Sequence, residues 1–328
     1  MLRAVCLDVE TGDLIHDVEV FARDTPGAIH EKNSHATPTP IIACDRVYLH
    51  FGTYGTACVS TAGEVLWRKQ IEYDHVHGPG SSPVLVGDVL IFSCDGRKDP
   101  FVVALEKQTG DVRWKMPRPD APADKPTFAF STALVMEMDG RTEVVIPGSN
   151  SVCSYEPATG REIWHVKYPG GFSTVPRPVQ GHGLVYMSTG YGPCHLLAIR
   201  LGGEGDVTET NVVWRESRGP PLNPSPLLVG DELYMVADNG VVTCLDAHTG
   251  EAHYRKRIAG NYSASPLHAA GRIYINNETG LTMVFRPGPQ FEQLATNQVE
   301  GRTLASLTPI EGALLLRTDT HLYRIEAQ

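Results

Sequence analysis

Residues 244–250 read Cys-Leu-Asp-Ala-His-Thr-Gly, and this phrase decides the fold because it recurs along the chain. It matches residues 6–12 (Cys-Leu-Asp-Val-Glu-Thr-Gly) and residues 104–110 (Ala-Leu-Glu-Lys-Gln-Thr-Gly). Looser copies lie at residues 58–63, 153–160 and, with an insertion, 198–214. The glycines of two successive copies, Gly110 and Gly160, are 50 residues apart. A period of this length is typical of four-stranded propeller blades, so the sequence predicts a repeated β-sheet unit.

An aromatic residue stands near the same place in five of the repeat units. It lies four residues after the glycine at Trp67, Trp114, Trp164 and Tyr254, and Trp214 is equivalent after the insertion. All four tryptophans of the chain therefore occupy one repeat position. A buried aromatic contributes about 150–250 Å² of contact area, so we expect these side chains to pack between neighbouring blades. The Thr-Gly pair supplies the positive backbone angle of a tight turn between the two outer strands.

A second phrase, rich in serine, threonine and proline, precedes each unit. Its copies are Thr37–Pro40, Ser81–Pro83, Pro176–Pro178, Ser225-Pro226 and Ser265-Pro266. An apolar run, a short Gly-containing turn and a second apolar run follow each copy. No segment shows sustained helical periodicity, so the predicted class is all-β.

The repeats predict a single β-propeller domain over residues 1–328. Six complete blades occupy about residues 35–300, and partial blades occupy residues 1–34 and 301–328. We favour an eight-blade plan with incomplete first and last blades. The alternative is a closed seven-bladed ring, in which Leu14–Phe21 completes the last blade and one strand is left over.

The recurrent phrase resembles the docking motif of pyrroloquinoline-quinone (PQQ) type propellers, and the resemblance covers nearly the whole chain. Residues 181–186, 205–208, 261–266 and 316–325 look like the PQQ-binding-like repeat proteins of planctomycete-type bacteria. The architecture is also similar to that of the propeller lipoprotein of outer-membrane assembly. The resemblance implies a fold and little function. It also implies an exported or periplasmic relative, although residues 1–8 contain no signal peptide; the compartment therefore stays unassigned.

Composition excludes several classes of partner. The formal net charge is −10 and no basic run is present, so nucleic acid is a poor partner. The longest apolar stretches are far shorter than the roughly 20 residues of a membrane helix, so no membrane span is predicted. The oligomeric state is not predicted.

Cysteine and histidine are the residues of this chain that could carry redox or metal chemistry. Cys6, Cys58, Cys153 and Cys244 stand where other copies have alanine, so we interpret them as small core residues. No adjacent cysteine pair of the kind found in PQQ alcohol dehydrogenases is present. His75 and His77 are the most suggestive metal-like pair, but they lack a third ligand of their own. No metal site, catalytic residue or cofactor is therefore predicted.

The long polar loops predict the binding face. Loops that enter the first strand of a blade, or join its second and third strands, lie on one face of a propeller. We expect the ligand-binding residues to converge there, at the channel mouth: His35, Tyr54, His75, His77, Arg177, Tyr191, Asn223, Asn261, Tyr262 and Arg302. This composition suits a non-catalytic binding or scaffolding propeller for a protein, peptide or glycan. The alternative is a PQQ- or metal-dependent oxidoreductase, which would need PQQ or a divalent cation.

Overall fold

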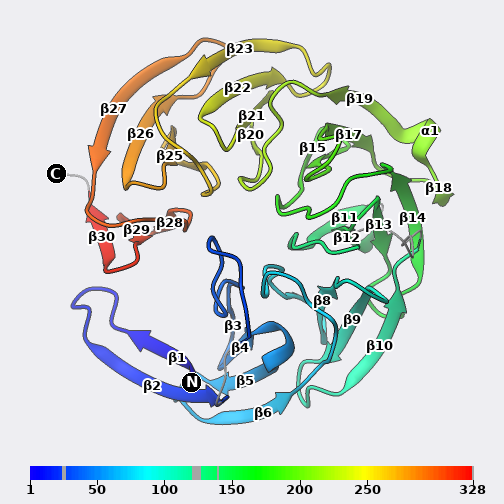
Figure 1. Ribbon diagram of the computed structural model, residues 1–328, viewed down its shortest axis with the longest axis vertical. Helices are drawn as coiled ribbons and strands as arrows, with labels where there is room; N and C mark the ends of the chain where they lie inside the picture. The colour runs from blue at the N-terminus through cyan, green and yellow to red at the C-terminus, as the bar shows by residue number, and fades with distance from the viewer. Residues whose placement is uncertain (24–26, 120–126, 139, 327–328) are drawn as a thin grey trace. The chain divides into compact units, whose positions relative to one another are not determined.

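The secondary structure is almost entirely β (Figure 1). The computed structural model describes residues 1–23, 27–119, 127–138 and 140–326. Two single helical turns, η1 (Gly52–Tyr54) and α1 (Thr208–Asn211), interrupt the strands. The predicted all-β class is confirmed. None of the described helices is long and apolar enough to cross a membrane.

The chain forms two compact units, which are described separately. Unit 1 comprises Met1–Ser173 and Gly202–Val207, and unit 2 comprises Thr174–Leu201 and Thr208–Gln328. In both units most sheets have four antiparallel strands in sequence order, which is the topology of a propeller blade.

Unit 1 contains three complete blades. Their strands are β3 (Ile41–Ala43), β4 (Arg46–His50), β5 (Thr56–Ser60) and β6 (Val65–Lys69); β7 (Val84–Val86), β8 (Val89–Cys94), β9 (Phe101–Glu106) and β10 (Val112–Pro117); and β11 (Leu134–Met138), β12 (Arg141–Pro147), β13 (Ser151–Tyr155) and β14 (Glu162–Lys167). A short fifth strand, β18 (Gly205–Asp206), lies parallel to β14 beside Trp164.

Unit 2 also contains three complete blades. Their strands are β15 (Val179–Gly181), β16 (Leu184–Ser188), β17 (Leu196–Arg200) and β19 (Val212–Glu216); β20 (Leu227–Val229), β21 (Glu232–Val236), β22 (Val241–Asp246) and β23 (Ala252–Arg257); and β24 (Leu267–Ala269), β25 (Arg272–Asn276), β26 (Leu281–Arg286) and β27 (Glu292–Gln298).

Smaller sheets stand near the two ends of the chain. β1 (Leu2–Leu7) pairs with β2 (Leu14–Phe21), and β28 (Thr308–Ile310), β29 (Ala313–Arg317) and β30 (Leu322–Glu326) form a three-stranded sheet. Together with the six complete blades these sheets hold 29 strands. That is the content of seven four-stranded blades with one strand over, as the seven-bladed alternative expects. The strands fit this alternative, so the eight-blade plan that repeat counting favoured is wrong, and the terminal strands lie in incomplete sheets.

The regular spacing of the aromatic residue along the repeats has a direct structural cause. Three of the tryptophans dock onto the Thr-Gly turn of the following blade. The indole N–H donates to a turn carbonyl in each case: Trp67 to Lys107 at 3.0 Å, Trp114 to Pro157 at 2.8 Å and Trp214 to Ala247 at 3.1 Å. The turn glycine lies under the indole ring. A Cβ at Gly110 would approach the Trp67 ring to 2.6 Å, and φ at Gly110 is +75°, so both space and backbone angle require glycine.

Trp164 departs from this pattern. Its indole N–H donates to the carboxylate of Glu143 within its own blade, at 3.0 Å. Glu143 is fully buried and also accepts hydrogen bonds from Arg141 and Ser154. The polar contact of the Trp164 indole therefore lies within its own blade and not with a neighbouring Thr-Gly turn. The insertion after β17, which replaces that turn, contributes β18 instead.

The Ser/Thr-Pro phrase forms a hydroxyl ladder between blades. In unit 1 the Thr39 N–H donates to the Ser82 hydroxyl at 2.8 Å, and the Ser82 N–H donates to the Thr132 hydroxyl at 3.0 Å. Unit 2 repeats the arrangement from Arg177 to Ser225, Ser225 to Ser265 and Ser265 to Ser306, at 2.9–3.0 Å. Each hydroxyl satisfies a backbone donor that has no strand partner, which explains the residue type at this position.

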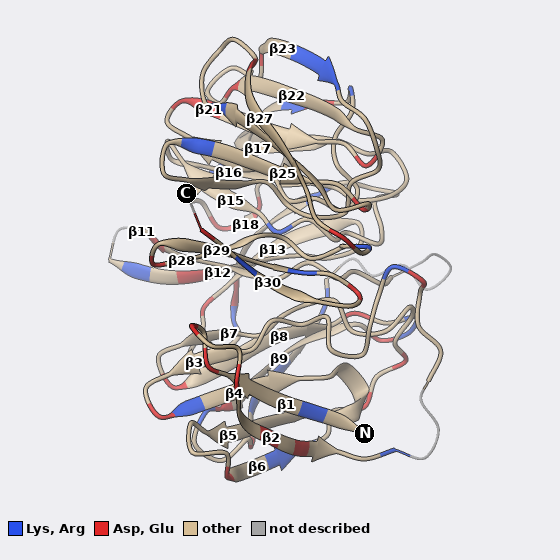
Figure 2. Ribbon diagram, turned by 90° about the vertical axis from the view of Figure 1, so that its left-hand side faces the viewer, with Lys and Arg blue, Asp and Glu red and all other residues tan. Residues whose placement is uncertain are grey.

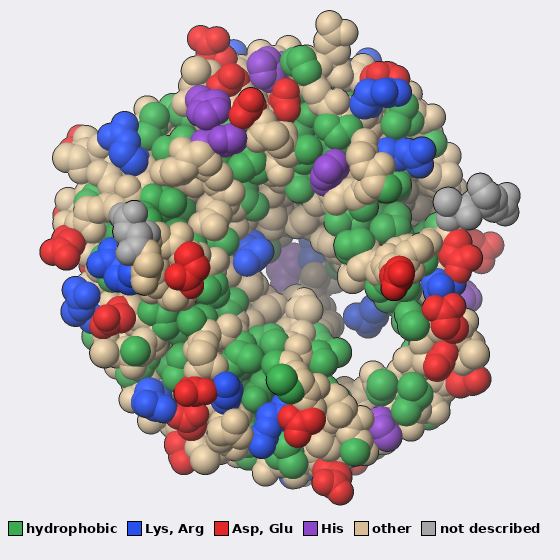
Figure 3. Space-filling view, turned by 180° about the vertical axis from the view of Figure 1, so that it is seen from behind, with side chains coloured by type: hydrophobic (Ala, Val, Ile, Leu, Met, Phe, Trp, Pro, Cys, Tyr) green, Lys and Arg blue, Asp and Glu red, His purple; other side chains and the backbone are tan. Residues whose placement is uncertain are grey.

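Acidic and basic residues are interspersed over the described surface. Figures 2 and 3 show both signs of charge side by side along the strands and loops in these two views.

Candidate functional site

The ten residues predicted for the binding face fall into two groups. His35, Tyr54, His75 and His77 belong to unit 1, whereas Arg177, Tyr191, Asn223, Asn261, Tyr262 and Arg302 belong to unit 2. Their convergence on one channel mouth stays a prediction, and each group is described within its own unit.

The four residues of unit 1 lie around one histidine-rich loop cluster. The His35 ring packs edge-on against Tyr54, with centroids 4.9 Å apart, and His77 packs edge-on against His30 at 5.2 Å. The backbone carbonyl of His77 accepts hydrogen bonds from the His30 N–H and the Asn33 side-chain amide, at 3.1 and 2.7 Å. The segment before β3 is therefore fastened to the loop after β6. Sequence reasoning missed His30 because it lies outside the repeated phrases.

A small polar cavity of about 10 Å³ lies beneath this cluster. Its lining includes His50, Tyr73, His75, Ser81 and Asp95. Burial lowers the pKa of His50 to about 4, so this imidazole is neutral at physiological pH. Among the described residues, neither the Ser81 hydroxyl nor His75 Nδ1 has a hydrogen-bond partner, so they do not form a nucleophile–base pair. The volume admits about one water molecule, which makes this cavity too small for a substrate.

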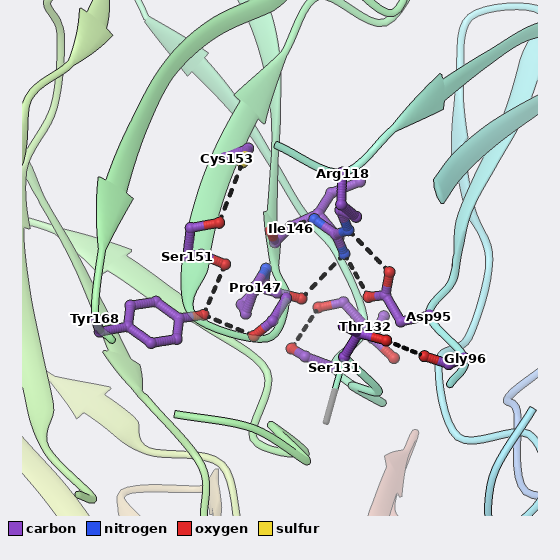
Figure 4. Close-up of polar contacts among 12 residues, drawn as sticks. Asp95, Gly96, Arg118, Ser131, Thr132, Ile146, Pro147, Ser151, Cys153 and Tyr168 are labelled. Carbon is purple, nitrogen blue, oxygen red and sulfur yellow. Dashed lines mark hydrogen bonds and ion pairs between the residues drawn. The ribbon is translucent and has the colours of Figure 1, made fainter. Parts of the chain in front are cut away.

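Asp95 on the cavity wall is held by a buried ion pair (Figure 4). The Arg118 guanidinium donates to both Asp95 carboxylate oxygens, at 2.9 and 2.7 Å, and to the carbonyls of Ile146 and Pro147 in the next blade. The side chains of Arg118 and Asp95 are 4% and 0% exposed. Burial lowers the pKa of Arg118, but Asp95 together with Tyr155 and Cys153 raises it, and the net shift is upward, so the guanidinium stays charged. Arg118 therefore links two blades, and Asp95 is a structural residue that holds its guanidinium in place.

Two of the predicted residues of unit 2 are also structural. Tyr262 is fully buried, and its hydroxyl donates to the Ala259 carbonyl at 2.8 Å. Its ring therefore cannot offer an exposed aromatic surface to a ligand. The Asn223 side chain donates to Asp238, whose carboxylate also accepts the Leu222 N–H at 2.8 Å. Both residues shape loops because their polar groups are used within the fold.

The other four predicted residues of unit 2 are exposed. Arg177 occupies the hydroxyl-ladder position that serine or threonine holds in the other blades, and its backbone N–H donates to Ser225. The backbone N–H of Arg302 donates to Asp319 at 2.9 Å, while Asn261 accepts the Glu278 N–H through its carbonyl. Tyr191 is 37% exposed. These four residues therefore lie on the surface of unit 2.

A larger groove lies on the last complete blade, where sequence reasoning did not look. It has a volume of about 510 Å³ and is lined by Ala270, Gly271, Arg272, Tyr274, Val284, Arg286, Leu294, Ala295 and Asn297. Strand register explains its origin. Ala295 pairs with Val284 as Tyr254 pairs with Cys244 in the preceding blade, so Ala295 occupies the docking-aromatic position. The missing aromatic in residues 292–298 was the signal that could have revealed this groove.

The groove combines an apolar floor with a cationic edge. Val284 is buried, Tyr274 is half-buried and Leu294 is 40% exposed. Arg286 pairs with Glu292 at 2.9 Å, whereas Arg272 forms no ion pair with any described residue. In the preceding blade the corresponding face is occupied, because Tyr254 packs against Phe291 with centroids 5.6 Å apart. The groove therefore offers the contacts that an aromatic side chain uses elsewhere in this chain.

Comparison with known proteins agrees with these repeats and this topology, which define a β-propeller protein of the PQQ-like repeat class. The family described as outer membrane protein assembly factor BamB matches residues 2–116, 98–201 and 203–287. The chain belongs to that family. No curated protein matches the sequence.

Among solved structures, BamB from Moraxella catarrhalis is similar. The TM-score is 0.64 at 13% sequence identity, over 86% of this chain and 81% of that chain. An identity this low supports the shared propeller fold alone.

Proposed function

We propose that this protein is a non-catalytic propeller that binds a peptide segment of a partner protein. The observation that carries the proposal is the 510 Å³ groove at Ala295. Its volume lies within the range of about 300–1,000 Å³ that is typical of ligand pockets. A BamB-like propeller scaffold is consistent with a role in protein interaction.

The groove indicates the chemistry of the peptide. Tyr274, Val284 and Leu294 provide apolar contact for an aromatic side chain, and this chain uses tryptophan or tyrosine at the equivalent position of the preceding blades. Arg272 at the edge can pair with a carboxylate. We therefore expect the bound segment to present an aromatic residue beside an acidic one.

The test is selection of random 12-residue peptides displayed on phage against the wild-type protein. Selected peptides are then titrated against Ala295→Trp, which places an indole in the groove. Thr296→Trp is the matched control, because adjacent residues of a strand point to opposite faces. We expect enriched peptides with an aromatic residue beside Asp or Glu, at least about tenfold weaker binding to Ala295→Trp, and unchanged binding to Thr296→Trp.

Other outcomes would overturn the proposal. Failure to enrich any peptide, or equal binding to Ala295→Trp and wild type, excludes the groove. Loss of binding in the Arg177→Ala/Arg302→Ala variant alone would move the site to the polar loops. Stoichiometric PQQ binding with calcium-dependent dehydrogenase turnover would contradict the non-catalytic assignment.

A further inference from the structure

Three turns of unit 2 bring two histidines and an aspartate together. His182 lies in the turn between β15 and β16, Asp231 in the turn between β20 and β21, and His248 in the turn between β22 and β23. One ligand atom from each side chain lies within 4.8 Å of the other two. On the face drawn in Figure 3, histidine side chains lie beside acidic ones near the top of the view. The cluster joins two neighbouring blades through residues far apart in sequence.

The docking of Trp214 holds these turns in place. Its indole N–H donates to the Ala247 carbonyl, and the Ala247 N–H donates to the Asp231 carbonyl at 2.9 Å. Trp214 belongs to the same blade as His182. The hydrogen bond from Trp214 to Ala247 therefore also fixes the position of the His248 turn relative to His182. Within the turn, the Asp246 carboxylate accepts the His248 N–H at 2.9 Å. The three side chains therefore stand on rigid turns, as a preorganised site requires.

The separations fit metal coordination. Asp231 Oδ1 lies 3.7 Å from His182 Nε2 and 3.4 Å from His248 Nε2. Ligands at about 2.0–2.1 Å in a tetrahedral zinc site lie roughly 3.3–3.4 Å from one another. The two imidazole centroids are 4.3 Å apart, so closure around an ion needs only small rotations of exposed side chains.

We propose that His182, Asp231 and His248 form a binding site for a first-row divalent transition-metal ion, of which Zn²⁺ is the representative. Two imidazoles and one carboxylate are a ligand set for zinc and its neighbours, whereas Ca²⁺ and Mg²⁺ prefer oxygen ligands alone. Three protein ligands leave a coordination position open to water or to a partner's side chain.

The same side chains also have ordinary hydrogen-bonding roles. His182 Nε2 lies 3.0 Å from the Gly230 carbonyl, a bond that requires a proton on this nitrogen. Metal binding uses the neutral imidazole with that nitrogen free, so the ion competes with the bond to Gly230.

The experiment measures Zn²⁺ binding by isothermal titration calorimetry. The background protein is Cys6→Ser/Cys44→Ser, because these two exposed thiols would also bind zinc. His182→Asn keeps a residue that tolerates the φ of +57° at this position, and His248→Gln introduces the residue found at the equivalent Gln108. Asp88→Asn is the matched control, since Asp88 occupies the same place as Asp231 in another blade.

We expect one equivalent of Zn²⁺ to bind the background protein, with at least about tenfold weaker binding in His182→Asn and in His248→Gln. Asp88→Asn should bind like the background, and Ca²⁺ and Mg²⁺ should give no saturable heat. Circular dichroism and melting temperature establish that each variant is folded. Absence of saturable zinc binding, or a one-equivalent affinity that neither histidine variant changes, would overturn the proposal. The peptide selection uses no metal. Failure of the zinc experiment therefore does not bear on the peptide proposal, and failure of the peptide selection does not bear on the zinc proposal.

Discussion

Two blade junctions, one in each unit, share a backbone plan and differ in their exposed side chains. The first junction lies between blades β3–β6 and β7–β10, and the second between blades β15–β19 and β20–β23. In the first, Trp67 donates to the carbonyl of Lys107, and in the second, Trp214 donates to that of Ala247. In both, the N–H of that turn residue donates at 2.9 Å to the carbonyl of an aspartate in the preceding turn. The junction geometry is therefore set by backbone groups and the indole.

The exposed side chains of the two junctions take different partners. In the first, Asp88 forms an ion pair with Lys107 at 2.8 Å. In the second, the equivalent Asp231 faces two imidazoles, His182 and His248. Because the docking contacts do not involve these side chains, one scaffold can carry a surface ion pair at one junction and a metal-type ligand set at another.

The largest effect should come from removing the shared indole. Replacing Trp67 or Trp214 with alanine deletes a large packed side chain and leaves a turn carbonyl without its donor, so each variant should lose about 3–5 kcal/mol of unfolding free energy. Urea denaturation of both variants measures this. A loss below about 1 kcal/mol in either would show that docking is not a shared structural element. Zn²⁺ binding should also weaken in Trp214→Ala but not in Trp67→Ala.

A smaller effect should be a difference between the two junctions in how their stability depends on pH. His50 ends β4 of the first junction, where the second has the buried Ser188. Burial lowers the pKa of His50 from 6.5 to about 4, so the unfolded chain binds more protons between these values. Stability contributed by the neutral imidazole is complete above about pH 6.5 and falls by up to about 3 kcal/mol as pH drops to about 4. Replacement of His50 should therefore reduce the change of unfolding free energy with pH between about 4 and 6.5.

The variant His50→Gln keeps a hydrogen-bonding group toward Thr56, whose hydroxyl lies 2.9 Å from His50 Nδ1. Denaturation of wild type and variant at several pH values between 4 and 7 gives the comparison. A variant that loses stability in parallel with wild type over this interval would exclude His50 as the titrating group. Ser188→Ala should leave the slope unchanged, because serine does not titrate in this range.

Substitutions can give the first junction the ligand residues of the second. Cys44 and Gln108 occupy the positions of His182 and His248, and Asp88 already supplies the carboxylate. The variant Cys44→His/Lys107→Ala/Gln108→His should raise the zinc stoichiometry from one to two equivalents. Loss of the exposed Asp88–Lys107 pair should cost no more than about 1 kcal/mol. Calorimetry on a Cys6→Ser background tests this, and an unchanged stoichiometry would mean that turn position alone does not build the site.

The fold was predictable because the repeat carries its own physical requirements. Each docked indole requires a glycine in the turn beneath it, and each backbone N–H without a strand partner requires a hydroxyl. These requirements recur with every blade, so the Thr-Gly phrase and the Ser/Thr-Pro phrase are both visible in the sequence. Trp164 was not predictable from this pattern, because its partner Glu143 lies in an ordinary strand position. Repeat counting placed partial blades at the two ends of the chain, but it could not decide between eight blades and seven.

The candidate sites were less predictable because they depend on contacts between turns. His182, Asp231 and His248 look like ordinary turn residues in the sequence, and only the docking of one blade on the next makes them neighbours. Conversely, Tyr262 resembled a binding residue because it is aromatic and follows an asparagine in a polar loop, yet its ring is buried. Polarity of a loop predicts neither the direction nor the partners of its side chains.

The smallest effect concerns the cysteines of the first junction. Cys58 is fully buried where the second junction has Ala198, and burial raises the pKa of its thiol, whereas Cys44 is exposed in a turn. Replacement of Cys58 with alanine should therefore cost about 1 kcal/mol or less, because the slot accepts either residue. In the folded protein a thiol reagent should label Cys44 and the exposed Cys6 rapidly, and Cys58 only on unfolding. Peptide mass mapping after a short pulse distinguishes these sites. Labelling of Cys58 as fast as Cys44 would show that the first junction opens under native conditions, which its docked indole should prevent.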